Sequence, residues 1–316
     1  MNSPSLLEFG HGITAIDTDY VRPLLDASHL IVRNGRAAFV DTGTTHSVPN
    51  LLATLEQKGI DSAAVDYVLL THVHLDHAGG AGELMRHLPN ARALVHPRGA
   101  AHIIDPSKLI AGTKAVYGAD EFARLYGEIP PIPAERVLTV NDDMRMPLGS
   151  SELQFIHTPG HALHHYSIVD ADSGGVFTGD TFGISYRIFD TAQGAFIFPA
   201  TTPVHFDPEQ AHMSLDRIMS FEPEACFLTH YSRVTELQRL AEDMHRGIDT
   251  LVAMAKSSMP SADRIADMKP KIHKWLVQAV RAHGCMLDQN TVDTWLSMDV
   301  DLNAKGLAVW LDRVSD

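Results

Sequence analysis

Short apolar runs recur along the chain, and each ends in a polar or glycine-containing turn. Runs of this kind, rich in β-branched and aromatic side chains, are typical of buried strands. The pair Asn34-Gly35 separates two of them and favours the positive φ angles of a tight hairpin turn. We therefore predict strands at residues 13–16, 30–32, 37–40, 65–70, 91–95, 137–140, 153–157, 166–169, 176–178 and 225–228.

Helical periodicity marks several of the intervals between these strands and the whole chain beyond His230. Ser47 can cap a helix that runs to Lys58, and Asp207-Pro208 can open another. A helical insertion within residues 98–126 separates the early strands from those at 137 onward, which suggests two similar halves. Further helices are predicted at 81–88, 234–256, 261–283 and 291–314. This order predicts a mixed α/β fold with a helical C-terminal extension.

The first helix of that extension carries an apolar stripe with spacings of three and four residues. A stripe of this kind normally packs on a core. A homodimer surface, or a cover over the mouth of an active site, is the alternative. The stripe consists of Leu237, Leu240, Met244, Ile248 and Leu251.

The stretch that follows the apolar run 65–70 combines histidines with an aspartate. Its polar members are His72, His74, Asp76 and His77. Neutral imidazole and carboxylate are ligands that zinc, iron and manganese accept. Because a turn after a strand aims alternate side chains in different directions, His72 and His74 can face one ion while Asp76 and His77 face a second.

Further candidate ligands follow later strands. His161 comes after the turn Pro159-Gly160, Asp180 follows Gly179, and His230 follows the run 225–228. Each side chain lies where a predicted strand ends. Strand ends that meet on one rim of a sheet are where an open α/β fold assembles its site.

These four ordered motifs, HxHxDH, GH, GD and TH, resemble the metallo-β-lactamase superfamily, and most closely its glyoxalase II-like hydrolases. The resemblance covers residues 10–231. It implies a four-layer αββα sandwich at residues 1–232, with residues 233–316 as a helical extension packed on it. It also implies a dinuclear site, in which the first ion is held by His72, His74 and His161, the second by Asp76, His77 and His230, and both by Asp180.

The same resemblance gives roles to residues around the ions. Asp76 and Asp180 are the candidate catalytic residues. Asp41, in Asp41-Thr42-Gly43, is expected to support the ligands or anchor the loop without binding an ion. His165 is expected to support a ligand, whereas His164 is either pocket-lining or structural. The expected cofactors are two divalent metal ions, zinc first, with iron or manganese as alternatives.

Residues 181–202 are unusually aromatic for a loop and leave directly from Asp180. We expect this loop to line the substrate pocket or form part of a lid, although its rings could instead pack it onto the body. Arg187 could meet a substrate carboxylate or phosphate, or form a salt bridge. The candidate pocket residues are Phe182, Tyr186, Arg187, Phe196 and Phe198.

The ligand set predicts hydrolysis. Two divalent ions about 3.5–4 Å apart can generate a metal-bound hydroxide and polarise a carbonyl oxygen. We expect a small ester-like substrate: a thioester, a lactone or a carboxylic ester. The alternatives are a phosphodiesterase, an iron-dependent oxygenase or sulfur dioxygenase, and a signalling protein with vestigial hydrolase activity.

Composition narrows the partners and the compartment. The formal net charge of −14 disfavours nucleic acid, whose binding depends on Lys and Arg. No run approaches the ~18–20 apolar residues of a membrane span, and residues 1–12 lack the pattern of a signal peptide. The two cysteines, Cys226 and Cys285, form no disulfide framework or CxxC pattern. We therefore expect a cytoplasmic protein that acts on a small molecule.

Overall fold

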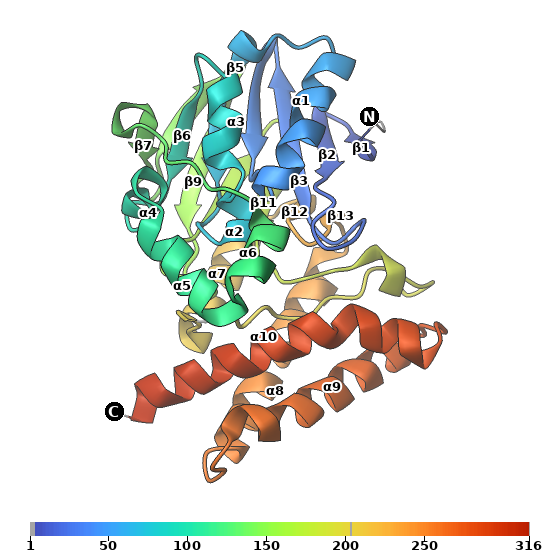
Figure 1. The fold of residues 1–316 in the computed structure, drawn as a ribbon. Helices are drawn as coiled ribbons and strands as arrows, with labels where there is room; N and C mark the ends of the chain where they lie inside the picture. Colours follow the sequence, from blue (N-terminus) through green and yellow to red (C-terminus); the bar gives the residue numbers. More distant parts are fainter. Residues whose placement is uncertain (1–3, 203, 316) are drawn as a thin grey trace. The chain divides into compact units, whose positions relative to one another are not determined.

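The computed structural model describes residues 4–202 and 204–315, which contain two β-sheets. The first sheet runs from β1 to β7 in sequence order (Figure 1). Neighbouring strands are antiparallel from β1 to β4 and parallel from β4 to β7. Its strands are β1 (Leu6–Phe9), β2 (Ile13–Asp17), β3 (Ala27–Arg33), β4 (Arg36–Val40), β5 (Val65–Leu70), β6 (Arg92–Val95) and β7 (Val137–Thr139).

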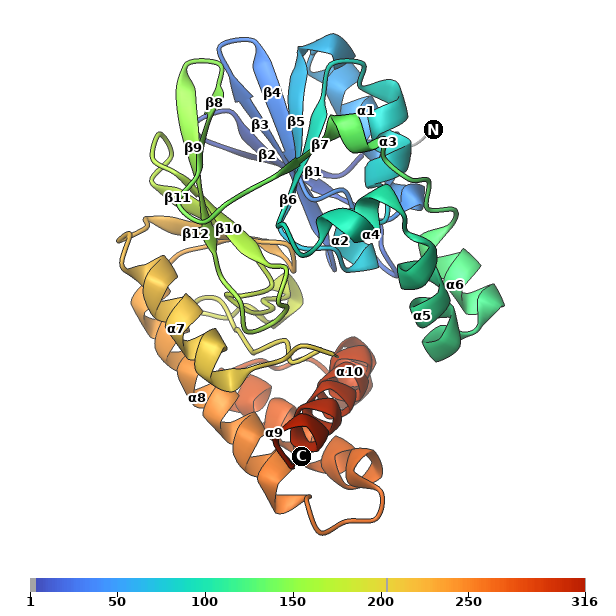
Figure 2. The same cartoon turned by 90° about the vertical axis from the view of Figure 1, so that its left-hand side faces the viewer.

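The second sheet has the order β13-β12-β11-β10-β9-β8, and its pairs from β8 to β11 are antiparallel. Figure 2 shows the two sheets packed against each other, with helices α1 and α3 on the outer side of the first. The strands are β8 (Arg145–Leu148), β9 (Ser151–His157), β10 (Tyr166–Asp170), β11 (Gly175–Gly179), β12 (Ala225–Leu228) and β13 (Ser232–Val234).

A predicted hairpin and a buried apolar cluster explain how the first sheet forms. Arg33 pairs with Arg36 across the turn, and Asn34 and Gly35 have φ angles of 46° and 77°, which confirms the hairpin between β3 and β4. Burial of Phe39, Val68, Leu51 and Leu84 in one cluster joins the first sheet to α1 and α3. The helices of this region are α1 (Val48–Gln57), α2 (Leu75–Ala78), α3 (Ala81–His87), α4 (Ala100–Ile104), α5 (Ser107–Tyr117) and α6 (Ala119–Tyr126).

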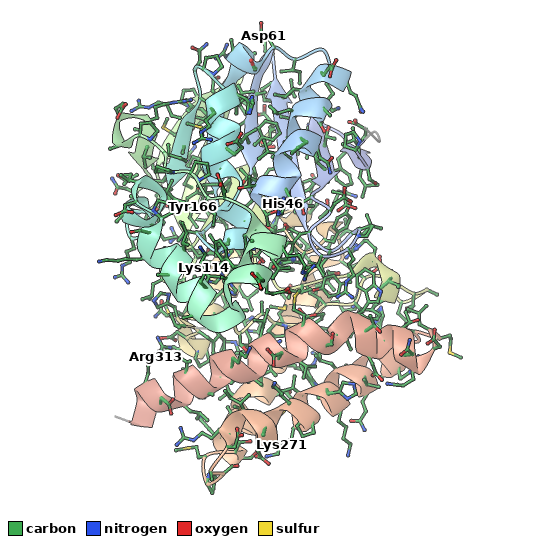
Figure 3. All side chains as sticks on the ribbon, viewed as in Figure 1. His46, Asp61, Lys114, Tyr166, Lys271 and Arg313 are labelled. Carbon is green, nitrogen blue, oxygen red and sulfur yellow. The ribbon has the colours of Figure 1, made fainter. Side chains whose placement is uncertain are left out.

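Aromatic side chains fill the space between the two sheets. The rings of His29, Phe177 and Phe227 pack with centroids 4.8–5.7 Å apart. The buried Tyr166, labelled in Figure 3, donates a hydrogen bond of 2.8 Å from β10 to the carbonyl oxygen of Leu94 in β6. Residues of both sheets therefore contribute to one interior.

The sequence analysis grouped the strand near residue 137 with the later strands, which is wrong. Residues 137–139 form β7, which pairs in parallel with β6 at the edge of the first sheet. Parallel neighbours require a long crossover connection. Helices α4 to α6 supply that crossover and do not divide the chain into halves. The sequence also missed β1, β8 and β13, which are short and partly exposed.

Two compact units make up the chain. The first contains residues 1–157, 164–179 and 226–233, and the second contains 158–163, 180–225 and 234–316. The second unit includes α7 (Pro208–Met219), α8 (Leu237–Ser257), α9 (Arg264–Ala282) and α10 (Gln289–Ser315), so the predicted helical extension is confirmed. Whether residues 1–232 and 233–316 behave as separate domains stays a prediction.

The apolar stripe of α8 is buried within the second unit. Leu237, Leu240, Met244, Ile248 and Leu251 are each at most 6% exposed. The core interpretation of this stripe is therefore confirmed. No helix in residues 4–202 or 204–315 is both long enough and apolar enough to cross a membrane.

Candidate metal centre

The histidine-rich stretch leaves the end of β5 and turns at once into α2. His74 occupies the N-cap position of this short helix with extended backbone, and Asp76 and His77 lie in its single turn. Gly80 follows because the turn packs directly on residues 42–44: a Cβ there would lie 2.6 Å from the carbonyl oxygen of Thr44. Strand, turn and glycine together place the polar side chains at the end of the strand.

Hydrogen bonds determine which ring nitrogens of His77 and His230 remain for an ion. The Nδ1 atom of His77 donates to Asp41 Oδ2 at 2.9 Å, and the Nδ1 atom of His230 donates to the carbonyl oxygen of Leu25 at 2.9 Å. Because a carbonyl or carboxylate oxygen accepts, each Nδ1 carries the proton. The Nε2 atom of each ring is then the ligand atom.

Those Nε2 atoms lie beside the carboxylate of Asp76. Asp76 Oδ2 is 3.8 Å from His77 Nε2 and 3.6 Å from His230 Nε2. These separations are too long for good hydrogen bonds. They are somewhat longer than the roughly 3.3 Å that separates two ligands bound at about 2.0–2.1 Å to one tetrahedral ion, so a small inward movement of the side chains would let all three bind one ion. The donor set therefore fits a divalent metal ion.

Asp41 is buried behind this group and has several donors. Its carboxylate accepts from the backbone N–H and hydroxyl of Thr71, from the hydroxyl of Thr229 and from His77. The backbone of Asp41 has a φ angle of 55°, in the left-handed region. These contacts hold the Asp41 carboxylate in place beside His77, and its supporting role at a metal centre stays a prediction.

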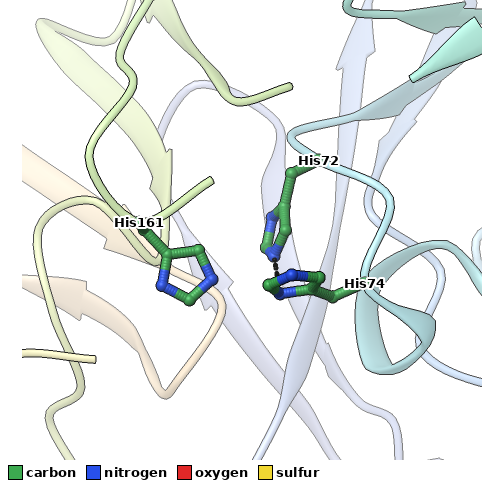
Figure 4. Close-up of side chains that lie close together, drawn as sticks. All are labelled: His72, His74 and His161. Carbon is green, nitrogen blue, oxygen red and sulfur yellow. Dashed lines mark hydrogen bonds between the residues drawn. The ribbon is translucent and has the colours of Figure 1, made fainter. Parts of the chain in front are cut away.

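His72 and His74 lie together at the start of the stretch. His72 Nε2 is 2.9 Å from His74 Nδ1, as the dashed line in Figure 4 marks. His72 Nδ1 contacts the hydroxyl of Thr71 at 3.2 Å. The ring of His165 is centred 5.0 Å from that of His72, and His164 Nδ1 accepts from the backbone N–H of Val73 at 3.4 Å. Both later histidines thus contact the segment that carries the first ligands.

His161 and Asp180 show the same arrangement within the second unit. His161 Nδ1 donates to the carbonyl oxygen of Ala200 at 3.0 Å, and its Nε2 lies 3.5 Å from Asp180 Oδ2. Gly160, before His161, has a φ angle of 131°, and a Cβ there would meet the backbone of Ala211. The turn predicted from Pro159-Gly160 thus requires glycine.

Within the first unit, Asp76, His77 and His230 each have one ligand atom within 4.8 Å of those of the other two. Imidazole nitrogen with carboxylate oxygen suits zinc, iron and manganese alike. The chemical argument rests on this set of three residues.

The family of this chain follows from its similarity to known proteins. Residues 22–230 match the sequence profile of the family described as the metallo-beta-lactamase superfamily. The chain belongs to the metallo-β-lactamase superfamily. The four-layer fold that the sequence motifs implied is confirmed by this match and by the two packed sheets.

Two proteins of known sequence illustrate the similarity of this superfamily member to its relatives. A hydroxyacylglutathione hydrolase of Xanthomonas euvesicatoria pv. vesicatoria is 31% identical over 311 residues, which cover 95% of this chain and 97% of that protein. The metallo-beta-lactamase fold-containing protein ST1585 of Sulfurisphaera tokodaii is 25% identical, and the aligned part covers 70% of this chain and 77% of that protein.

Solved structures give the same fold. The crystal structure of ST1585 from Sulfolobus tokodaii has a TM-score of 0.67 at 21% identity and covers 94% of this chain and 98% of that one. A chemotaxis sensor, described with a peroxy diiron species, has a TM-score of 0.54 at 13% identity and covers 77% and 94%. The second match shows that iron also occurs in proteins with this fold.

The sequence analysis of this superfamily member missed one buried carboxyl group near the candidate metal centre. Asp26 is fully buried, and burial raises its pKa to about 7, against the opposing effect of the charges on His230 and His77. Its Oδ2 accepts from the hydroxyl of Thr18 at 3.1 Å. A lone aspartate before a strand belongs to no motif, so nothing in the sequence distinguished it.

The aromatic loop has the contacts of a packed core. Its rings are at most 7% exposed, and Phe189 and Tyr186 both pack on Trp295 of α10. Tyr186 donates to Asp299, and Arg187 binds the carbonyl oxygen of Ser185 and pairs with Asp190 at 3.4 Å. These contacts pack the loop on α10 within the second unit. The pocket role of Phe182, Tyr186, Arg187, Phe196 and Phe198 stays a prediction.

Proposed function

We propose that this protein is a dinuclear metal-dependent hydrolase that cleaves a small ester-like bond, with a thioester as the first candidate, then a lactone or a carboxylic ester. The observation that carries the proposal is the group Asp76, His77 and His230. Each of its imidazoles has Nδ1 engaged by an acceptor and Nε2 beside the Asp76 carboxylate. A histidine-rich loop without a metal role has no need of this arrangement.

In this proposal two ions share the ligands that the superfamily motifs imply. His72, His74 and His161 bind the first, Asp76, His77 and His230 bind the second, and Asp180 binds both. The ions would supply a hydroxide at neutral pH and would polarise the carbonyl of the substrate. The protein's own contribution is to fix the imidazole tautomers through Asp41 and the carbonyl oxygens of Leu25 and Ala200.

The thioester preference is supported by the Xanthomonas relative. Its name gives hydroxyacylglutathione as the substrate, which is a thioester, and its similarity extends over nearly the whole of both chains. The acidic balance of the chain, with a formal net charge of −14, supports a small substrate over a nucleic acid.

The test combines elemental analysis of protein purified without added metal with a screen of thioesters, lactones and phosphodiesters on the same sample. Two equivalents of metal at the catalytic centre, with turnover of a thioester or another ester, are expected. Asp180→Asn should reduce the affinity for both ions, whereas His230→Ala should empty mainly the second site. One or two equivalents of iron, with oxygen consumption and no hydrolysis, would overturn the proposal.

The surface residue His273 provides a matched control for these variants. Its Nε2 lies 2.7 Å from Asp293 Oδ1 on the helical part of the chain, in a histidine–carboxylate pair that contains none of the proposed ligands. His273→Ala should leave metal content and turnover unchanged. Equal metal loss in His273→Ala and His230→Ala would mean that the loss reports general destabilisation and not a ligand.

A further inference from the structure

Two histidines face each other where α7 packs on α8. His212 Nδ1 lies 2.6 Å from His245 Nδ1, and the two rings are nearly parallel, with an interplanar angle of 6° and centroids 4.9 Å apart. Their side chains are 28% and 30% exposed, so small ions reach them without unfolding. Neither residue belongs to the superfamily motifs or to the proposed catalytic centre.

The outer nitrogen of each ring has a carboxylate partner on the opposite helix. His212 Nε2 lies 3.2 Å from Asp249 Oδ1, and His245 Nε2 lies 3.2 Å from Asp216 Oδ1. An ionised carboxylate only accepts, so each Nε2 carries a proton. In two neutral rings, both Nδ1 atoms would then direct a lone pair at the other across 2.6 Å. An electrophile, either a proton or a metal ion, must lie there.

The spacing of these residues along each helix is the same. His212 and Asp216 are four positions apart in α7, and His245 and Asp249 are four positions apart in α8, so each pair lies on one helix face. The result is a quartet in which two inner imidazoles are flanked by two outer carboxylates. A carboxylate that holds the far nitrogen of an imidazole is the usual support of a histidine ligand to a metal.

We propose that His212 and His245 bind one divalent transition-metal ion of the Zn²⁺ or Cu²⁺ class through their Nδ1 atoms. Asp216 and Asp249 orient the rings, and water completes the coordination. Tetrahedral Zn²⁺ with bonds of about 2.0–2.1 Å separates two nitrogens by about 3.3 Å, so the pair opens by about 0.7 Å when the ion enters. The ion joins α7 to α8 within the second unit.

Zinc counting by equilibrium dialysis and elemental analysis tests this site. The wild-type chain should bind one more equivalent of Zn²⁺ than His212→Ala/His245→Ala, and hydrolase activity should be equal in both. His273→Ala, which removes a single histidine of a surface pair, should bind as much as wild type. Equal zinc content in the wild type and the double variant would overturn the proposal.

A second comparison separates this site from the proposed catalytic centre. His77→Ala/His230→Ala should lose zinc from the catalytic centre and keep the ion that His212 and His245 bind. Adding the 212/245 substitutions should then remove one further equivalent. If the catalytic double variant already binds no zinc, the site between α7 and α8 does not exist, whatever becomes of the proposed function.

Carboxylate variants keep the test decisive if the double alanine variant does not fold. Asp216→Asn/Asp249→Asn retains both imidazoles and removes only their support, so the affinity of the site for Zn²⁺ should fall by about 10–100-fold. Unchanged affinity would overturn the assigned geometry. A histidine pair that merely shares a proton would bind no additional zinc in any of these comparisons, and that result would also overturn the proposal.

Discussion

Asp41 determines the tautomer of His77 because its carboxylate accepts a hydrogen bond from the Nδ1–H group of that ring. The same carboxylate accepts from the backbone N–H and hydroxyl of Thr71 and from the hydroxyl of Thr229, so it connects the end of β5 to the segment that carries His230. One buried residue thus positions two parts of the proposed centre.

The first prediction is that Asp41→Asn weakens metal binding by about 10–100-fold. Asparagine tolerates the left-handed backbone of residue 41, but its amide offers one acceptor oxygen where the carboxylate offers two. Zinc affinity measured by competition with a chelator checks the outcome. Asp66→Asn, which breaks the partly exposed pair with Arg36, is the control and should leave affinity unchanged. Equal affinity in both variants would contradict the role of Asp41.

At the scale of elements, His29 of β3 packs between the two sheets. Its ring contacts Phe177 and Phe227, and its Nε2 lies 3.2 Å from the hydroxyl of Ser232. Burial lowers its pKa from 6.5 to about 3. The folded protein therefore holds this imidazole neutral at pH values where the unfolded chain binds a proton.

The second prediction follows from the sign of that shift. The contribution of the neutral His29 to the free energy of unfolding is fully present above pH 6.5. It is lost as the pH falls towards 3, at about 1.4 kcal/mol per pH unit. His29→Gln removes the titration and can still bond Ser232. Its free energy of unfolding should fall less steeply than that of the wild type between pH 6 and pH 4 in urea titrations. Identical slopes in His29→Gln and the wild type would contradict the prediction.

The third prediction concerns the aromatic loop. Phe189 is fully buried against Tyr186, Phe196 and Trp295. Phe189→Ala should lower the free energy of unfolding by about 3–5 kcal/mol. In chemical denaturation, the control Phe221→Ala, at a side chain 37% exposed, should cost far less. A raised KM with unchanged stability would instead support the pocket role.

The element scale also shows what the sequence could determine. The ligand residues stand in contiguous motifs after strands, so their types and spacing were sufficient to propose the centre. The carbonyl oxygens of Leu25 and Ala200, which engage His230 and His161, have no side-chain signature. The aromatic residues of 181–202 fitted a pocket and a core equally well, because aromatic rings are common in both. The structure adds the contacts of Tyr186 and Phe189 with Trp295, while the pocket role stays a prediction.

At the scale of the whole molecule, α10 contacts and buries side chains of residues 181–202, which lie far before it in the sequence. Thr201 donates from its backbone N–H and its hydroxyl to Asn303 Oδ1, at 2.6 and 2.7 Å. Tyr186 donates to Asp299, and both acceptors are almost completely buried in α10. Residues 180–225 and the C-terminal helices therefore form one compact unit.

The last prediction is that residues 1–232 alone do not form a stable protein. Removing α8 to α10 takes away the acceptors of Tyr186 and Thr201 and exposes rings that Trp295 now covers, so apolar surface and buried donors lose their partners together. The truncated chain should be insoluble, or should bind a hydrophobic dye and melt without cooperativity, while the full chain melts cooperatively.

A full-length chain with Asp299→Ala and Asn303→Ala distinguishes loss of these contacts from mere shortening. It should melt at a lower temperature than the wild type and remain soluble, because only the two polar acceptors are gone and the apolar cover is intact. If the 1–232 chain instead melts cooperatively and binds metal as the full chain does, the boundary between 232 and 233 separates true domains. The aromatic loop would then be free to serve a substrate, as the sequence alone allowed.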